Sequence, residues 1–214
     1  GVKSLKGFTH RAIFDRNEAA RWAAAAIATG GEIYGGGGKQ VEMMTFLNVY
    51  RKVGGELEIG DDGIRFYHPG SELQPVVIET DVHPGFMTDW QQPLVVALTQ
   101  AQGLSIVHET VYEQRFGFTD ALKQMGANIQ IYRECLGGHP CRFGQRNFNH
   151  SAVISGPTKL SSKKDGACLR TGPAGRRQAA HNLVRGATLS RPRAACLLGR
   201  KRNLDQDGPP LWPC

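Results

Sequence analysis

The chain has 214 residues, 40% of them hydrophobic, and a formal net charge of +7. Every apolar run falls short of the roughly 20 residues that a membrane helix needs, which excludes a membrane-spanning protein and favours a soluble globular one. The first residues, Gly1 to Ser4, contain neither an initiator Met nor the apolar core of a signal peptide, so we expect an internal piece of a longer protein.

The positive charge lies at one end of the chain. Residues 159–214 contain 12 Lys and Arg against 3 Asp and Glu, which leaves 14 against 16 in residues 1–158. The basic segment is rich in Gly, Ala, Pro and Arg without a helix or strand period, so we expect it to be disordered. It is either a basic arm that binds phosphate polymers or, as we favour, an out-of-frame reading of a GC-rich gene. The net charge therefore does not predict a nucleic-acid partner.

The first folded segment reads as helices and strands in alternation. Asp15 and Glu18 have the spacing of a capping box and open a helix over residues 16–29, which Gly30 ends. The elements that follow are a strand at 32–34, a helix at 41–53 ended by Gly54, and two strands at 56–59 and 64–67 that flank the turn Asp61-Asp62-Gly63.

The next segment repeats this order. Thr88 and Gln91 have the spacing of a second capping box, with Thr88 as the cap of a helix that runs from Asp89 to Ala101. The elements that follow are a strand at 104–110, a helix at 118–125, a strand at 128–132, and a turn at 136–139 into a strand near Arg142. Corresponding residues lie 72 or 73 positions apart, as in the pairs Ile33/Ile106, Phe46/Phe118, Gly54/Gly126 and Ile59/Ile131.

The predicted fold class is α/β, built of β-α-β-α-β-β repeats. The two copies cover about residues 1–74 and 75–147, and a third starts near Phe148. The first helix of each copy is apolar on nearly every face, from Ala23 to Ile27 and from Leu94 to Leu98, so we expect helices inside and sheets outside. Residues 1–158 would then form a partial domain that precedes the tail at 159–214.

Asp89 is the strongest candidate for catalysis. It follows the turn His83-Pro84-Gly85 and lies in the first turn of its helix, where free amides and the helix dipole favour the charged carboxylate. With Thr88 as the cap, the Asp89 side chain would be free to accept a proton from a bound hydroxyl. The alternative is an acidic first-turn residue that only stabilises the helix. Arg115, in a loop between strand and helix, either binds a phosphate or carboxylate or pairs with Glu113.

The five cysteines predict no disulfide framework. Three lie in the basic tail, and Cys135 and Cys141 flank a Gly-rich turn, which agrees with a reducing, cytoplasmic compartment. Cys135, His139, Cys141 and His150 can be drawn as a zinc site, but they lack the Cys-x-x-Cys spacing of structural zinc sites. We therefore expect no metal.

Two motifs resemble those of a known enzyme family. Phe86-Met87-Thr88-Asp89 and the stretch from His108 to Phe116, His-Glu-Thr-Val-Tyr-Glu-Gln-Arg-Phe, are similar to the UDP-N-acetylglucosamine 1-carboxyvinyltransferases, enolpyruvyl transferases that open peptidoglycan synthesis. The resemblance covers about residues 1–160, and Asp15-Arg16 and the segment 123–127 match as well. It implies two domains, each an inside-out α/β barrel of three β-α-β-α-β-β units.

The resemblance also implies residue roles. Asp89 would be the general base that contacts the attacking sugar hydroxyl, Val111 would line the nucleotide-sugar site, and Arg115 and Arg16 would lie at the domain cleft. The implied reaction moves the enolpyruvyl group of phosphoenolpyruvate to the 3-hydroxyl of UDP-N-acetylglucosamine without a metal or organic cofactor. Phe14 departs from the family pattern, in which Pro is usual at this position.

The family's catalytic Cys and its main phosphoenolpyruvate-binding residues belong to an N-terminal half that this sequence does not contain. We therefore expect the chain to need that N-terminal domain as a partner and to be inactive alone. Two alternatives stay open: the sister reaction on shikimate 3-phosphate, and a non-catalytic binding protein with a basic arm.

Overall fold

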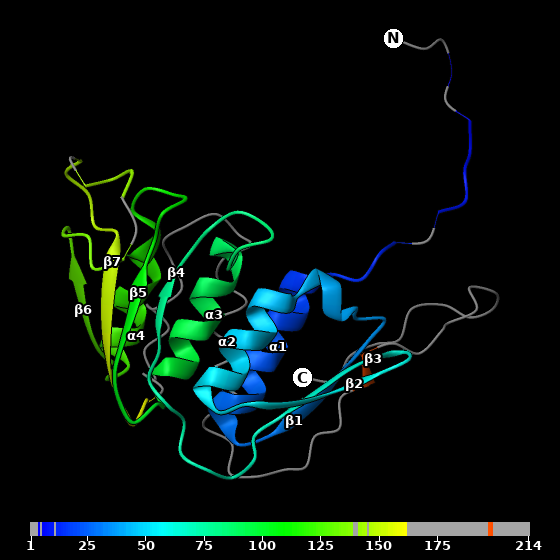
Figure 1. Ribbon diagram of the computed structural model, residues 1–214, viewed down its shortest axis with the longest axis horizontal. Coiled ribbons are helices and arrows are strands. Elements are labelled where there is room, and N and C mark those ends of the chain that lie inside the picture. The colour runs from blue at the N-terminus through cyan, green and yellow to red at the C-terminus, as the bar shows by residue number, and fades with distance from the viewer. Residues whose placement is uncertain are drawn as a thin grey trace.

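Two separate four-stranded sheets with helices between them make up the described part of the chain (Figure 1). The computed structural model describes residues 4, 6–10, 12–138, 141–144 and 146–161, and the short strand β8 (Leu197–Leu198). Apart from β8, the tail from residue 162 onward lies outside the described residues, so its predicted disorder stays a prediction. Within the described residues, no helix combines the length and apolar character that a membrane crossing requires.

The first sheet has the strand order β2-β3-β1-β8. The central strand β3 (Gly63–Tyr67) pairs antiparallel with β1 (Glu32–Gly36) and with β2 (Glu56–Gly60). The predicted hairpin turn at Asp61-Asp62 joins β2 to β3. Strand β8 pairs with β1 in parallel.

The second sheet has the order β4-β5-β7-β6. Strand β7 (Ser151–Gly156) pairs antiparallel with β5 (Gly103–His108) and with β6 (Asn128–Tyr132), and β4 (Val77–Glu79) pairs with β5 in parallel. The order β6-β7-β5 thus repeats β2-β3-β1 of the first sheet, and each sheet carries a parallel strand on the far side of β5 or β1. The second unit shows the predicted β-α-β-α-β-β succession.

Two predictions in this region are wrong. Residues 141–144 form a turn, so the residues described around Arg142 contain no strand. The partner of β6 is instead β7, because Ala152 and Ile154 supply the buried apolar side chains that a central strand needs. Residues 151–156, where we expected a third copy to begin, complete the second sheet.

The helices agree closely with the sequence pattern. Helix α1 (Arg16–Thr29) begins as predicted at Asp15, whose side chain accepts hydrogen bonds from the amides of Asn17 and Glu18 at 2.8 and 3.2 Å. The other helical segments are α2 (Met44–Val53), α3 (Thr88–Leu98), α4 (Thr119–Gln124), and the short 3₁₀ helices η1 (Gln40–Glu42) and η2 (Arg115–Phe118).

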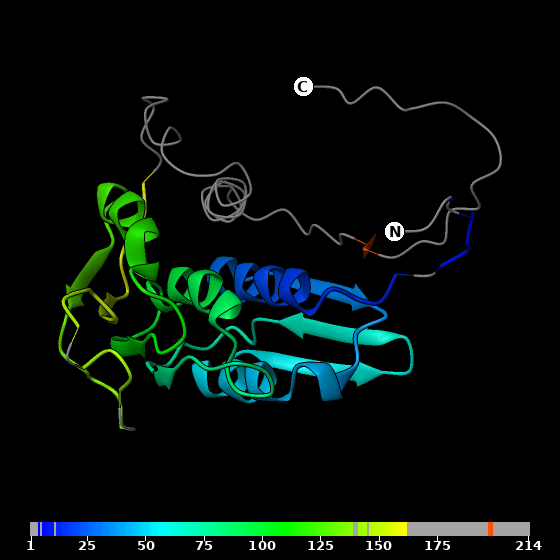
Figure 2. The same cartoon turned by 90° about the horizontal axis from the view of Figure 1, so that it is seen from above.

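Helices α1, α2 and α3 form a layer between the two sheets, as the views in Figures 1 and 2 show. Helix α3 is buried on nearly every side, as predicted. Helix α1 is not, because Arg21 and Trp22 are exposed, with 36% of Trp22 accessible. The expectation that both helices are fully buried therefore holds for α3 alone.

An aromatic cluster ties the helices to the first sheet. The ring of Phe46 lies 5.6 Å from Trp90 and 6.4 Å from Phe86, and Phe86 and Trp90 are 5.6 Å apart in an edge-to-face arrangement. Tyr50, one turn after Phe46, packs edge-on against Phe66 of β3 at 5.4 Å. The cluster therefore fixes α2 against the start of α3.

Candidate functional site

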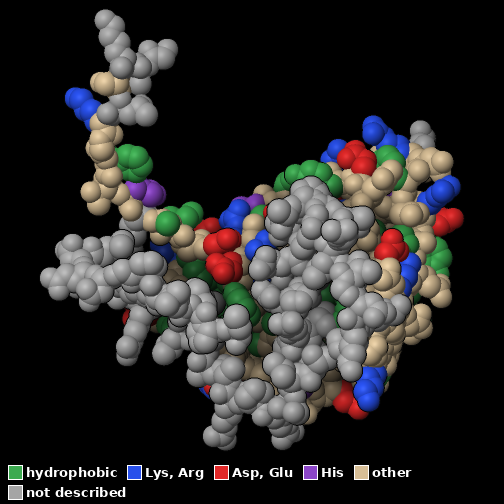
Figure 3. Space-filling model, turned by 180° about the vertical axis from the view of Figure 1, so that it is seen from behind, with side chains coloured by type: hydrophobic (Ala, Val, Ile, Leu, Met, Phe, Trp, Pro, Cys, Tyr) green, Lys and Arg blue, Asp and Glu red, His purple; other side chains and the backbone are tan. Residues whose placement is uncertain are grey.

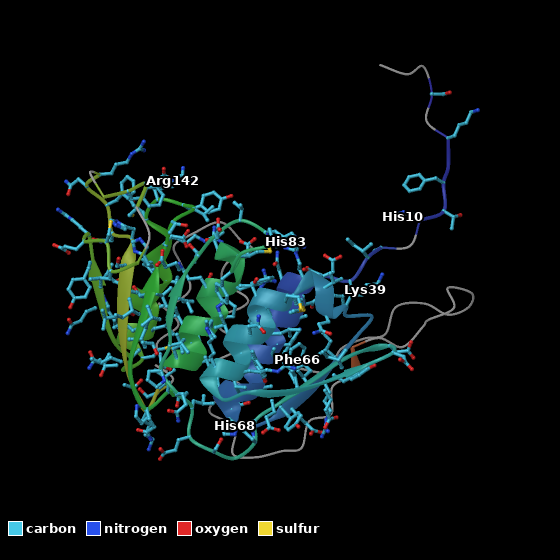
Figure 4. All side chains as sticks on the ribbon, viewed as in Figure 1. His10, Lys39, Phe66, His68, His83 and Arg142 are labelled. Carbon is cyan, nitrogen blue, oxygen red and sulfur yellow. The ribbon has the colours of Figure 1, made fainter. Side chains whose placement is uncertain are left out.

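The N-termini of α1, α2 and α3 and the carboxyl ends of β4 and β5 point toward the same end of the molecule (Figure 1). Figure 4 places Lys39 and His83 at this end and His68 at the opposite end. Free helix amides and strand-end loops gather here, which is the arrangement that α/β proteins use to bind anionic ligands.

The turn before α3 is held by backbone hydrogen bonds. The amide of Asp81 donates to the carbonyl of Phe86, and that of Gly85 to the carbonyl of Val82, both at 2.7 Å. A Cβ at Gly85 would lie 2.5 Å from the Cβ of Asp81, so this closed turn requires glycine. The turn therefore fixes the position from which α3 starts.

The predicted cap of α3 is wrong. Met87 occupies the cap position without a side-chain hydrogen bond. Thr88 instead donates its hydroxyl hydrogen to Oε2 of Glu109 at 2.9 Å, and Nε2 of Gln91 donates to the same oxygen at 2.7 Å. The Thr-x-x-Gln spacing does place both side chains on one helix face, but there they donate to the buried Glu109 carboxylate and do not accept amide hydrogens of the first turn.

Glu109 is the centre of this arrangement, and the sequence reasoning missed it. Its side chain is fully buried, and its Oε1 accepts the amide hydrogens of Val111 and Tyr112 at 2.8 and 3.0 Å. Four donors therefore surround one carboxylate, as burial of a charge requires. The neighbouring His108 is also buried, which, together with the charge of His150, lowers the pKa of His108.

Asp89 and Arg115 are in direct contact. Nη2 of Arg115 donates to Oδ1 of Asp89 at 2.7 Å, and the guanidinium lies 5.0 Å from the ring centre of Tyr112. The exposed fractions are 42% for the Asp89 side chain and 27% for Arg115, so both are open to a ligand. The expectation that the Asp89 side chain is free is therefore wrong. Glu113, the alternative partner of Arg115, lies 3.9 Å from Arg146 instead.

Pro93 leaves the backbone carbonyl of Asp89 as a second free hydrogen-bond acceptor at this site. Pro93 lies inside α3, four residues after Asp89, and has no amide hydrogen to donate to the Asp89 carbonyl. The helix therefore leaves that carbonyl without its usual backbone donor, beside the carboxylate of the same residue.

Arg16 does not join the other predicted site residues. It begins α1 and forms an ion pair of 3.2 Å with Glu42 of η1. A pocket beside α1, lined by Phe14, Trp22 and Phe66 among others, includes neither Asp89 nor Arg115. The described structure therefore groups Asp89, Val111 and Arg115 around Glu109 and leaves Arg16 on a neighbouring helix.

Comparison with known proteins identifies relatives for most of the chain. Residues 1–156 match the family EPSP synthase (3-phosphoshikimate 1-carboxyvinyltransferase). The chain is 51% identical over 164 residues to a UDP-N-acetylglucosamine 1-carboxyvinyltransferase of Protochlamydia amoebophila, a match that covers 77% of this chain and 35% of the relative. The corresponding protein of Chlamydia pneumoniae is 44% identical over 160 residues, covering 75% and 35%.

A solved structure supports the same fold. The enolpyruvyl transferase NikO from Streptomyces tendae matches over 71% of this chain and 32% of its own, with a TM-score of 0.58 and 18% identity. The chain spans about a third of the length of the curated relatives that it matches. It belongs to the EPSP synthase family of carboxyvinyl (enolpyruvyl) transferases and is a homologue of UDP-N-acetylglucosamine 1-carboxyvinyltransferases.

Proposed function

We propose that this chain is part of a cytoplasmic enzyme that transfers the enolpyruvyl group of phosphoenolpyruvate to the 3-hydroxyl of UDP-N-acetylglucosamine, the first committed step of peptidoglycan synthesis. The observation that carries the proposal is the Asp89–Arg115 pair at the start of α3. The relatives' names, at 51% and 44% identity, support the choice of substrate.

Asp89 is the general base in this proposal. The sugar hydroxyl oxygen adds to the enol carbon of phosphoenolpyruvate, its proton passes to Asp89, and another proton joins the methylene carbon. Loss of phosphate and of one proton from the resulting methyl then restores the double bond in the product. Arg115 engages only Oδ1 of Asp89, so Oδ2 provides an acceptor for the hydroxyl hydrogen.

Arg115 couples the base to an anionic substrate. A guanidinium binds phosphate as well as carboxylate groups, so a substrate anion that binds Arg115 leaves the Asp89 carboxylate free to accept a proton. The cation–π contact with Tyr112 keeps the guanidinium near its place during this exchange.

Val111 and Arg16 complete the substrate-binding residues that we propose. The Val111 amide is fixed by Glu109 while its side chain is half-buried, which suits a wall of the nucleotide-sugar site. Arg16 lies at the N-terminus of α1, among the helix ends that face the same side as α3, and would line the domain cleft.

The complete domain would be an inside-out barrel of three units, of which residues 1–158 supply two. The exposed side of α1 around Trp22 is the surface that a third unit would cover. The N-terminal domain of the same enzyme would be the partner that brings the catalytic Cys and the phosphoenolpyruvate-binding residues, so the chain alone would be inactive.

Two other functions make different predictions. A sister enzyme would bind shikimate 3-phosphate rather than a uridine nucleotide. A nucleic-acid-binding protein would use the basic tail, which lies outside the described residues. On the face drawn in Figure 3, the Lys and Arg side chains of the described residues are interspersed with Asp and Glu rather than gathered. That pattern does not favour a nucleic-acid surface on this face.

A chimeric enzyme tests the proposal. Residues 1–158 replace the matching segment of the Protochlamydia amoebophila relative, and phosphate release is measured with phosphoenolpyruvate and either UDP-N-acetylglucosamine or shikimate 3-phosphate. We expect turnover with the nucleotide sugar alone. Asp89→Asn should lower it, and the control Asp120→Asn, a first-turn acid of α4 with a 77% exposed side chain, should not. Turnover with shikimate 3-phosphate only, or equal activity of both variants, would refute the assignment.

A further inference from the structure

Four side chains that could hold a metal ion converge at one end of the second sheet. They are His108 at the end of β5, His150 just before β7, and Cys135 and Cys141 in the loop between β6 and β7. One ligand atom of each lies within 4.8 Å of all the others. Arg142, which follows Cys141, marks this region in Figure 4.

The spacing suits a tetrahedral metal ion. With Zn–S bonds of about 2.3 Å and Zn–N bonds of about 2.0 Å, tetrahedral ligand atoms lie roughly 3.3–3.8 Å apart. The observed limit of 4.8 Å therefore needs a contraction of at most about 1.5 Å. Sγ of Cys135 already lies 3.3 Å from Nε2 of His150.

The hydrogen bonds of His108 leave its Nε2 as an unused acceptor. The hydroxyl of Ser151 donates its hydrogen to the carbonyl of Glu134 at 2.7 Å, so its oxygen must accept the hydrogen on Nδ1 of His108 at 2.8 Å. The lone pair of His108 is then on Nε2. That atom is buried and has no hydrogen-bond partner among the described residues. A buried polar atom without a partner costs free energy that a bound cation would recover.

His150 is oriented in the same way. Its Nδ1 lies 2.9 Å from the carbonyl of Phe148, which can only accept, so Nδ1 carries the hydrogen and Nε2 carries the lone pair. Both histidines thus use Nδ1 to hold their rings and leave the lone pair of Nε2 for a metal, as metal-bound histidines do.

Backbone amides in the loop between β6 and β7 hold Cys141 in place. The amide of Phe143 donates to Sγ of Cys141 at 3.3 Å, and the amide of Gly144 closes the turn on the carbonyl of Cys141 at 3.2 Å. Amide hydrogen bonds to sulfur fix the orientation of a cysteine, as outer-shell contacts do at metal sites.

We propose that His108, Cys135, Cys141 and His150 bind one Zn²⁺ as a structural Cys2His2 site. Two thiolates neutralise the ion, and two sulfurs with two imidazole nitrogens in a tetrahedral set select zinc over harder cations. The ion joins the loop at 133–150 to the end of β5. Because Glu109 follows His108 directly, the site also braces the loop that carries Val111 and Arg115. The inference does not depend on the proposed transferase activity.

Cobalt provides the test on the full 214-residue chain, reduced and stripped of metal. Added Co²⁺ should give the thiolate charge-transfer and visible bands of a tetrahedral site, and one equivalent of Zn²⁺ should abolish them. Competition with a chromophoric chelator then gives the zinc affinity. Cys135→Ser should weaken the affinity about 100-fold or more, and Ser151→Ala, which keeps all four ligands, about 10- to 100-fold. The matched control Cys168→Ser removes a thiol of the tail and should change nothing.

The wild-type spectrum decides the matter even if a variant fails to fold. Absence of the charge-transfer band in the reduced wild-type chain would overturn the proposal. So would a band that depends on Cys168 rather than Cys135, or a Cys135–Cys141 disulfide, detected by mass, that persists in reductant and excludes the metal.

Discussion

Replacing Glu109 by Ala removes the acceptor of four hydrogen bonds that join α3 to the loop of Val111 and Arg115. The bonds come from Thr88, Gln91 and the amides of Val111 and Tyr112, at 2.7–3.0 Å. The site is fully buried, so the donors lose their partner in a place that water reaches poorly.

The size of the effect follows from the number of donors. A buried donor without an acceptor costs about 1 kcal/mol or more, which gives about 4 kcal/mol for four. Water entering the vacated space satisfies some of them, so we expect a loss of about 2–4 kcal/mol. For a domain of this size, that corresponds to a melting temperature lower by roughly 4–16 °C.

The assay is thermal unfolding of the chimeric enzyme, together with its kcat/KM. The melting temperature and kcat/KM should both fall, because the loop that positions Arg115 loses its hydrogen bonds to Glu109. The matched control is Glu113→Ala in the same loop, whose side chain is 47% exposed and lies 3.9 Å from Arg146. The free energy of unfolding of this control should change by less than about 0.5 kcal/mol. A Glu109→Ala enzyme that melts within a degree of the parent would show that Glu109 does not hold the site together.

Further predictions concern the base, the incomplete fold and a helix end. In the chimera, Asp89→Asn should lower turnover by roughly 10²- to 10⁴-fold without loss of thermal stability, and near-normal turnover would reduce Asp89 to an ordinary first-turn acid. Residues 1–158 alone should be marginally stable and prone to aggregate because the side of α1 around Trp22 is exposed; a monomer with a sharp cooperative melt would contradict the three-unit barrel. Gly54→Ala, at a helix end with φ +101°, should cost roughly 1 kcal/mol in unfolding experiments, whereas Gly7→Ala, with open space around it, should be neutral.

Sequence pattern was sufficient where the structure depends on local chemistry. The bounds of α1 and β6 agree with the predicted ranges, because a capping Asp15 and alternating apolar residues act within a few positions. The repeat was also visible, since Gly54 and Gly126 must both adopt positive φ, at 101° and 105°. The same local patterns set Asp89 in the first turn of α3.

Pairings between distant segments could not be read in this way. The Gly-rich turn after β6 suggested an immediate hairpin, but the partner strand begins only at Ser151, because β7 supplies the buried apolar residues. Likewise, Thr88 has the spacing of a cap, yet it lies inside the first turn of α3 and its hydroxyl donates to a carboxylate 21 residues away.

The sequence by itself determined the succession of helices and strands, the repeat, and the identity of the catalytic candidate, since each depends on neighbours along the chain. Only the tertiary structure decided that Asp89 meets Arg115, that Glu109 holds both sides of the site, and that His108 faces Cys135. Asp89 and Arg115 are 26 positions apart in the sequence, Glu109 is 18 to 21 positions from its donors in α3, and His108 is 27 positions from Cys135. Folding brings such residues together through burial and charge, which local spacing does not encode.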